Sequence, residues 1–172
     1  MKHLFYASIL ALIILSQSCS IKLSGASIPL DMKTIDVEFF ENNAPLVVNY
    51  LSQTVTEAIK DRIRQQTKLK IIRTEDADAV LSGSITGYSI APAAVQAPVG
   101  NAAPIASLTR LTITVNVKYV ANLKDAKEYS YETSFSRFKD YSGDISTQEQ
   151  SLITDITKQL TDDIFNKAFA NW

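Results

Sequence analysis

The sequence predicts an α/β fold, a two-layer sandwich in which a sheet of about four strands, mostly antiparallel or mixed, carries two helices on one face. Residues 108–120 alternate apolar and polar side chains, the pattern of a strand with one buried face. Segments 49–66 and 146–169 place apolar residues at the three- and four-residue spacing of amphipathic helices. Because the elements follow one another as strand, helix, strand, hairpin and helix, one sheet covered on one side buries every apolar stripe.

Residues 1–18 are expected to form a signal peptide. The position of Cys19 at its end resembles the lipobox of bacterial lipoproteins, which implies that Cys19 is the site of lipid attachment. The apolar run 4–15 is too short to cross a hydrocarbon core of about 30 Å. Cys19 is the only cysteine, so an intramolecular disulfide is excluded. The cleavage site departs from the usual lipoprotein pattern, because Ser16 stands three residues before the cysteine, with Leu15 one step further back. The alternative is an ordinary secretory signal with an unmodified Cys19.

Removing this segment leaves about 154 of the 172 residues, which suits one domain at 34–172 behind a tether at 19–33. The chain has 17 positive and 18 negative side chains, and Lys2 leaves with the signal, so the mature charge of 16 against 18 is −2. Without a basic excess, nucleic-acid binding is not expected. No later apolar stretch is long enough to span a membrane.

The first half of the domain predicts one strand, one helix and one short extended piece. Ile35, Val37 and Phe39 alternate with acidic residues and indicate a half-buried strand. A turn is expected at Asn42, Asn43 and Pro45. The helix 49–66 follows, then an extended segment at 68–74, and Asp76 and Asp78 indicate a second turn.

The second half predicts a hairpin and a C-terminal helix. A strand is expected at 79–90, where Gly83 and Gly87 mark a bulge or close packing. The Ala- and Pro-rich segment 91–107 has neither the two-residue period of a strand nor the period of a helix, and it is expected to be a long loop. Strand 108–120 and strand 128–138 should pair as a hairpin. Ser146 and Glu149 have the spacing of a capping box at the start of the last helix, whose final apolar turn, ending near Trp172, should dock on the sheet.

The chemistry of known catalytic sites is largely missing, so no enzyme, cofactor or metal is expected. The only histidine, His3, leaves with the signal, which removes histidine-based triads and metal sites. A hydrolase using serine and lysine stays open. The pairs Asp76 with Asp78 and Asp162 with Asp163 fit acid–base carboxylates or solvated polar positions. One set of aromatic side chains fits either a binding face or ordinary sheet packing: Tyr129, Tyr131, Phe135 and Phe138.

A series of segments in order along the chain resembles one family. They are GASIP (25–29), NNAPL (42–46), LSQTVTEAIKDRI (51–63), ITGYSIAP (85–92), RLTITVNVKY (110–119), SFSRFKDY (134–141) and DIFNKAFANW (163–172). Together with the lipoprotein signal, this series resembles the Bacteroidetes branch of the LPS-assembly lipoprotein family LptE. The resemblance covers nearly the whole mature chain.

The resemblance implies an α/β sandwich with a four-stranded sheet and two helices. It also implies an outer-membrane lipoprotein that sits in the lumen of the LptD β-barrel as a plug and assembly partner, and assists delivery of lipopolysaccharide to the cell surface. Two alternatives remain open: a lipid-anchored protein that binds an amphiphile directly, and an adaptor or pilot of another outer-membrane channel.

Basic side chains are candidates for contact with lipopolysaccharide phosphates or with the partner, although each also fits a solvated surface cation. They are Lys68, Lys70, Arg73, Arg110 and Lys118. Ser20 and Ile21 follow Cys19, so the aspartate that retains some lipoproteins in the inner membrane is missing, and so is an acidic surface-display run. The expected location is the periplasmic side of the outer membrane, held by the lipid.

Overall fold

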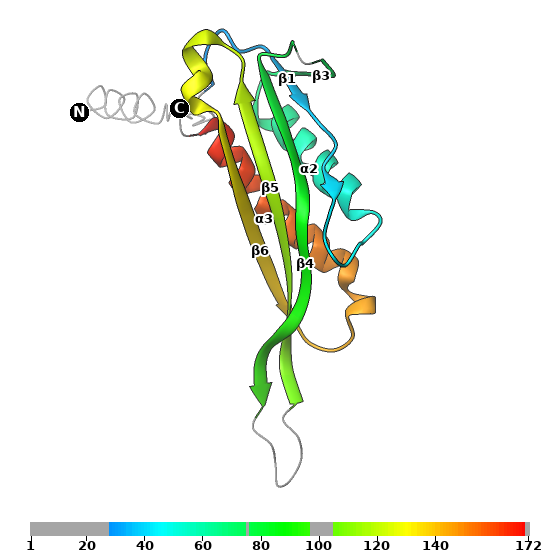
Figure 1. Ribbon diagram of the computed structural model, residues 1–172. Coiled ribbons are helices and arrows are strands. Elements are labelled where there is room, and N and C mark those ends of the chain that lie inside the picture. The colour runs from blue at the N-terminus through cyan, green and yellow to red at the C-terminus, as the bar shows by residue number, and fades with distance from the viewer. Residues whose placement is uncertain (1–27, 75, 97–104, 171–172) are drawn as a thin grey trace, which may run out of the picture.

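The computed structural model of the protein describes residues 28–74, 76–96 and 105–170 (Figure 1). The expected signal peptide, Cys19, most of the tether and Trp172 lie outside the described residues. None of the helices within the described ranges is both long and apolar enough to cross a membrane.

The described chain forms one mixed sheet with two long helices, which confirms the predicted fold class (Figure 1). Its strands are β1 (Thr34–Val37), β2 (Glu41–Asn42), β3 (Lys70–Ile72), β4 (Ala79–Gln96), β5 (Ile105–Ala121) and β6 (Tyr131–Tyr141). The helices are α2 (Leu51–Gln66) and α3 (Glu149–Phe169), with 3-10 turns η1 (Lys124–Tyr129) and η2 (Ile145–Thr147). The sheet order is β3-β1-β4-β5-β6, with β2 also beside β4. The described sheet has six strands, more than the roughly four predicted, because β2 and β3 are very short.

Strands β4, β5 and β6 form an antiparallel meander, and β1, β2 and β3 join it in parallel. The predicted alternation on β5 is confirmed, since its buried positions all face the helices: Leu111, Ile113, Val115, Val117 and Tyr119. The apolar stripe of each helix packs against these side chains in a single core. Both helices therefore cover the same face of the sheet, as Figure 1 shows.

The predicted buried position of Phe39 is wrong. β1 ends at Val37, and the Glu38 N–H still donates to the Leu81 carbonyl, at 3.0 Å. The strand alternation is then lost, so Phe39 is 60% exposed and Phe40 enters the core. The Phe40 N–H donates to the hydroxyl of Thr56 on α2, at 3.1 Å, which holds this segment between the helix and the sheet.

The turn predicted from Asn42 onward begins later. Asn42 belongs to β2, which pairs in parallel with Ser84 and Ile85. Its side-chain oxygen accepts from the N–H of Ala44, at 3.1 Å. The asparagine therefore ends a strand and caps the following turn through its side chain.

The long loop predicted at 91–107 is wrong where the structure describes it. β4 continues to Gln96, and β5 begins at Ile105 opposite it. Register shifts between Pro92 and Ala94 and between Ala94 and Val95 interrupt the regular alternation, so the sequence shows no strand period there. The two strands extend beyond the end of the helices as a projection (Figure 1), which we call the β4–β5 arm (89–96 and 105–109). Residues 97–104 lie outside the described ranges.

The capping box predicted at Ser146 does not form. Ser146 lies in η2, where its N–H donates to the side chain of Asp144, at 2.9 Å. α3 begins at Glu149, whose carboxylate accepts from the hydroxyl of Tyr88 on β4, at 2.7 Å. Burial, followed by the bond to Glu149, raises the pKa of the Tyr88 phenol. Glu149 thus ties the start of α3 to the sheet instead of capping the helix.

Strand β6 starts and ends three residues later than the predicted 128–138. Tyr129 lies in η1, before the strand. The predicted pairing with β5 is confirmed, with Tyr119 opposite Tyr131 and Thr109 opposite Tyr141.

Candidate functional site

One face of the meander is left without a covering element of the described chain, and we call it the open sheet face. It is rich in hydroxyl groups and poor in charge. Its members are Ser82, Ser84, Ser89, Thr112, Thr114, Asn116, Ser134 and Ser136. The Thr114 and Ser136 hydroxyls lie 3.0 Å apart, and the Asn116 amide donates to Ser134 at 3.4 Å. These cross-strand bonds link side chains of a neutral surface that can donate and accept hydrogen bonds.

Charged residues border this face near both ends of β6. Arg110 donates to Asp140 through two nitrogens, at 2.7 and 2.9 Å, and its guanidinium lies 3.7 Å from the centre of the Phe138 ring. The pKa of Asp140 is held below its usual value by this bond. At the other end, exposed Lys118 stands opposite Glu132. Arg110 is therefore already engaged within the domain, whereas Lys118 stands at the opposite end of the face.

The structure separates Arg73 from Lys68 and Lys70, the other two basic residues predicted near it. Arg73 lines a pocket of about 260 Å³ between β3 and α2, together with Lys60 and Arg64 from the helix. Neither Lys68 nor Lys70 belongs to this lining, and Lys70 alternates with Ile71, which does. The structure therefore brings together three cations of which the sequence interpretation had only one.

Lys60 and Arg64 were missed because each sits near an acidic residue on the same helix. Lys60 pairs with Glu57 at 3.3 Å and Arg64 pairs with Asp61 at 2.7 Å, which is the usual pattern of a solvated helix face. The signal that could have found them is their four-residue spacing, which puts both cations on one side of α2.

The aromatic residues of β6 do not form one binding face. Tyr131 stacks on Tyr119, with ring centres 5.7 Å apart, and Phe135 packs against the core. Phe138 lies on the other face of the strand, 49% exposed beneath Arg110. The packing interpretation is therefore confirmed for Tyr129, Tyr131 and Phe135.

The paired carboxylates hold structural contacts. Asp78 accepts from the N–H groups of Lys33 and Thr34, at 2.8 and 2.9 Å, and the Lys33 bond lowers the pKa of its carboxyl. Asp162 pairs with Arg62 at 3.0 Å, and Asp163 binds Arg137 on β6. Within the described ranges, no group of three or more potential ligand side chains could hold a metal ion.

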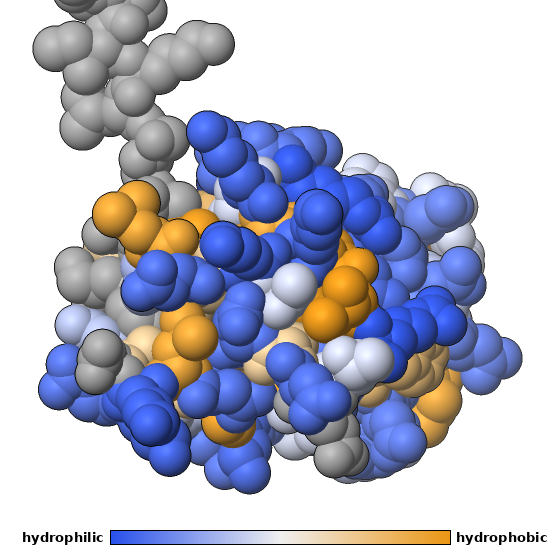
Figure 2. Space-filling model, turned by 90° about the horizontal axis from the view of Figure 1, so that it is seen from above, coloured by the Kyte–Doolittle hydropathy of each residue, from blue (hydrophilic) through white to orange (hydrophobic). Residues whose placement is uncertain are grey.

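The end of the molecule that lies uppermost in Figure 1 is seen in Figure 2. Apolar side chains form small patches there, separated by polar ones. Near the start of the described chain, Pro29 and Asp31 line a shallow pocket of about 130 Å³ with Leu123 and Lys124. The described residues visible in this view therefore form no single large apolar surface of the kind that marks a permanent interface.

A family model described as LptE, lipopolysaccharide-assembly, matches residues 32–168. Among solved structures, the chain is similar to a protein from Xanthomonas campestris, with a TM-score of 0.54 and 12% identity over 80% of this chain and 86% of that one. The chain is also similar to a hypothetical protein from Chlamydia trachomatis, with a TM-score of 0.52 and 12% identity over 81% of this chain and 99% of that one. The rare lipoprotein B from Shewanella oneidensis has a TM-score of 0.48 and 14% identity over 78% of this chain and 92% of that one. No curated protein sequence matches the chain.

Proposed function

The chain belongs to the LptE family of lipopolysaccharide-assembly lipoproteins, and on that premise we propose that it acts as plug and assembly partner of an LptD-type β-barrel in the outer membrane. The family is not enzymatic, so the chain is not an enzyme. Its contribution to lipopolysaccharide transport must therefore come from the surfaces that it presents to a partner or to the lipid.

The open sheet face is the observation that carries this proposal. The lumen of an outer-membrane barrel is polar, and its inward side chains alternate along every strand. A row of serine, threonine and asparagine side chains matches such a wall, because each hydroxyl or amide can donate and accept hydrogen bonds. Charge is confined to the ends of the face, at Arg110 with Asp140 and at Lys118 with Glu132. Docking would therefore desolvate few ions.

The β4–β5 arm supports the same arrangement. The chain from 79 to 109 contains no Asp, Glu, Lys or Arg. Beyond Thr109, opposite Tyr141, β5 pairs only with β4 among the described strands. A narrow, uncharged, two-stranded projection can enter a lumen that is too small for the whole sandwich.

The decisive experiment is purification of the tagged full-length protein from detergent-solubilised outer membranes, followed by identification of the bound protein. We expect an LptD-type barrel in near-equal molar amount. Recovery without any barrel would refute the proposal. Recovery with the channel of a different secretion system would favour the adaptor or pilot alternative.

We also propose that Cys19 is the lipidated N-terminus and that the lipid holds the domain on the periplasmic side of the outer membrane. Two or more acyl chains give stable anchoring, whereas one gives only weak binding. In a Cys19→Ala variant, we expect the protein to leave the outer-membrane fraction unless the barrel retains it. Fractionation in cells depleted of the barrel separates these cases, and unchanged membrane association there would contradict lipid anchoring at this residue.

A second candidate function, direct binding of an amphiphile, is favoured by the basic pocket of Lys60, Arg64 and Arg73. Guanidinium groups bind phosphate through charge-assisted hydrogen bonds, and Val37 and Ile71 give the pocket an apolar part. The same purification distinguishes the two candidates. Lipopolysaccharide recovered with the protein in the absence of any barrel would support the amphiphile-binding function.

A further inference from the structure

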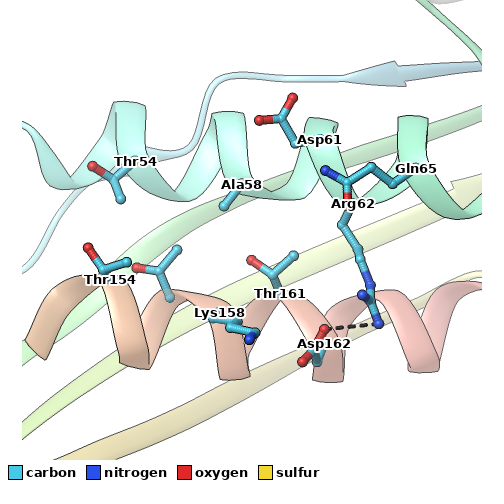
Figure 3. A pocket seen from close by; sticks show the side chains of 10 residues that line it. Thr54, Ala58, Asp61, Arg62, Gln65, Thr154, Lys158, Thr161 and Asp162 are labelled. Carbon is cyan, nitrogen blue, oxygen red and sulfur yellow. Dashed lines mark ion pairs between the residues drawn. The ribbon is translucent and has the colours of Figure 1, made fainter. Parts of the chain in front are cut away.

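The two helices enclose a groove that the proposed function does not use (Figure 3). It measures about 250 Å³ and is lined by residues of α2 and α3 only. Small side chains form its walls, namely Thr54 and Ala58 on α2 and Thr154, Thr157 and Thr161 on α3. In Figure 3, Arg62 crosses one part of the groove from α2 to reach Asp162 on α3.

Two threonines in this groove behave differently from their neighbours. The hydroxyls of Thr54, Thr56 and Thr154 each donate to the backbone carbonyl four residues earlier, at 2.7–2.9 Å. Thr157 and Thr161 are 2% and 5% exposed, yet their hydroxyls have no hydrogen-bond partner among the described residues. They stand one turn apart on α3, so both lie on the side that faces α2.

Arg62 adds a third unpaired polar atom at the same place. Its Nη2 pairs with Asp162 at 3.0 Å, and its guanidinium lies 5.3 Å from the centre of the Phe165 ring. Its Nε is buried, and no described residue offers it a hydrogen-bond acceptor. A buried polar group that stays unpaired costs about 1–3 kcal/mol, so three of them in one groove indicate that a partner group belongs there.

The chemistry of that partner group follows from what remains unpaired. Arg62 Nε can only donate, and the threonine hydroxyls are free to donate. Lys158, exposed at the groove, has no carboxylate within ion-pair distance among the described residues. The nearby carboxylates are engaged, Asp61 with Arg64 and Asp162 with Arg62. The missing group is therefore a hydrogen-bond acceptor that carries a negative charge.

We propose that the α2–α3 groove is a docking site for an acidic side chain on a segment of the barrel partner, whose carboxylate accepts from Thr157, Thr161 and Arg62 and faces Lys158. This inference rests on the proposed function. From Thr54 to Gln65 the groove follows eleven helical steps, about 16 Å at 1.5 Å each. That length fits a stretch of chain better than a small free anion.

The test replaces both hydroxyls with methyl groups in a Thr157→Val, Thr161→Val variant. Wild type and variant carry different tags, are expressed together, and their ratio is measured on the purified barrel. We expect the variant to be disfavoured about tenfold, as loss of hydrogen bonds to a charged group predicts. Thr147→Val is the control, since this exposed threonine lies outside the groove and its hydroxyl is already bonded to the Asp144 carbonyl, and its ratio should stay near one.

A second measurement is the Tm of the free domains. Removing unpaired buried hydroxyls should leave the Tm of the double variant unchanged or raise it by about 2 °C. A clear fall in Tm would mean that the hydroxyls are satisfied inside the free domain, and it would overturn the inference. An unchanged ratio on the barrel would also overturn it.

Lys158→Gln tests the charge of the partner group. We expect it to weaken the complex further and to reduce the dependence of binding on salt, because one ion pair is removed. An unchanged salt dependence would refute an acidic partner group. The two proposals fail differently: if wild type recovers no barrel, the proposed function fails, whereas recovery of wild type and double variant in equal amounts refutes only the groove.

Discussion

A Gly83→Ala substitution is expected to destabilise the domain by about 3 kcal/mol, the upper end of the usual cost of overpacking a core. A methyl group at this position would stand within contact distance of the backbone carbonyl oxygen of Asn116 and 2.5 Å from Cε1 of Phe40. The carbonyl belongs to β5 and cannot move without disturbing the sheet. Phe40 is fully buried between the sheet and α2, so it has little room to turn.

Urea unfolding of the isolated domain measures this effect, with Gly87→Ala as the control. A methyl group at Gly87 would lie 3.2 Å from Cβ of Thr114, a contact that a small shift relieves, so we expect a loss below about 1 kcal/mol. Adding Phe40→Leu to Gly83→Ala should recover part of the loss. Equal stabilities for the two alanine variants would contradict the close approach of Phe40 to β4.

A charged open sheet face is expected to abolish the barrel complex while leaving the domain folded. In a Thr114→Glu, Ser136→Glu variant, two carboxylates replace neutral hydroxyls at the centre of the face. Burying them against a partner without counter-charges costs at least about 2 kcal/mol, which corresponds to about thirtyfold in affinity. In the free domain the same side chains would stay in water, so the domain should stay folded, with a urea midpoint lowered only by the roughly 1 kcal/mol that two like charges directly opposite each other cost.

The measurement is the amount of barrel recovered with each variant from outer membranes. Ser142→Glu is the control, because this exposed serine follows β6 and lies outside the open sheet face. We expect it to recover the barrel as well as wild type does. Full recovery by the double variant would show that the barrel binds elsewhere on the domain.

The elements with unbroken periods were predictable from sequence. The alternation on β5 and the apolar stripes of α2 and α3 identified the core, because their spacing matches the geometry of the elements. Phe39 and Phe40 could not be assigned, since a one-residue step between β1 and β2 changes which of them enters the core. The extension of β4 to Gln96 could not be predicted either, because register shifts near Ala94 interrupt the alternation of a strand.

The candidate surfaces were less predictable because they combine residues far apart in sequence. Arg73 joins Lys60 and Arg64 only when β3 lies beside α2. The unpaired hydroxyl of Thr157 cannot be distinguished from the bonded hydroxyl of Thr154 by residue type, since the difference lies in where each side chain points on α3. By contrast, the uncharged stretch from 79 to 109 is visible in the sequence. Only the structure shows that part of it forms the projecting β4–β5 arm.

The β4–β5 arm also bears on the solubility of the protein before it meets a partner. Uncharged strands with open edges are templates for edge-to-edge aggregation. Pro92 interrupts this template, because proline has no N–H to offer a neighbouring strand. The register shifts on either side of Ala94 break the regular spacing of the remaining groups. The irregularity that made the arm hard to recognise as a strand therefore also protects it from self-association.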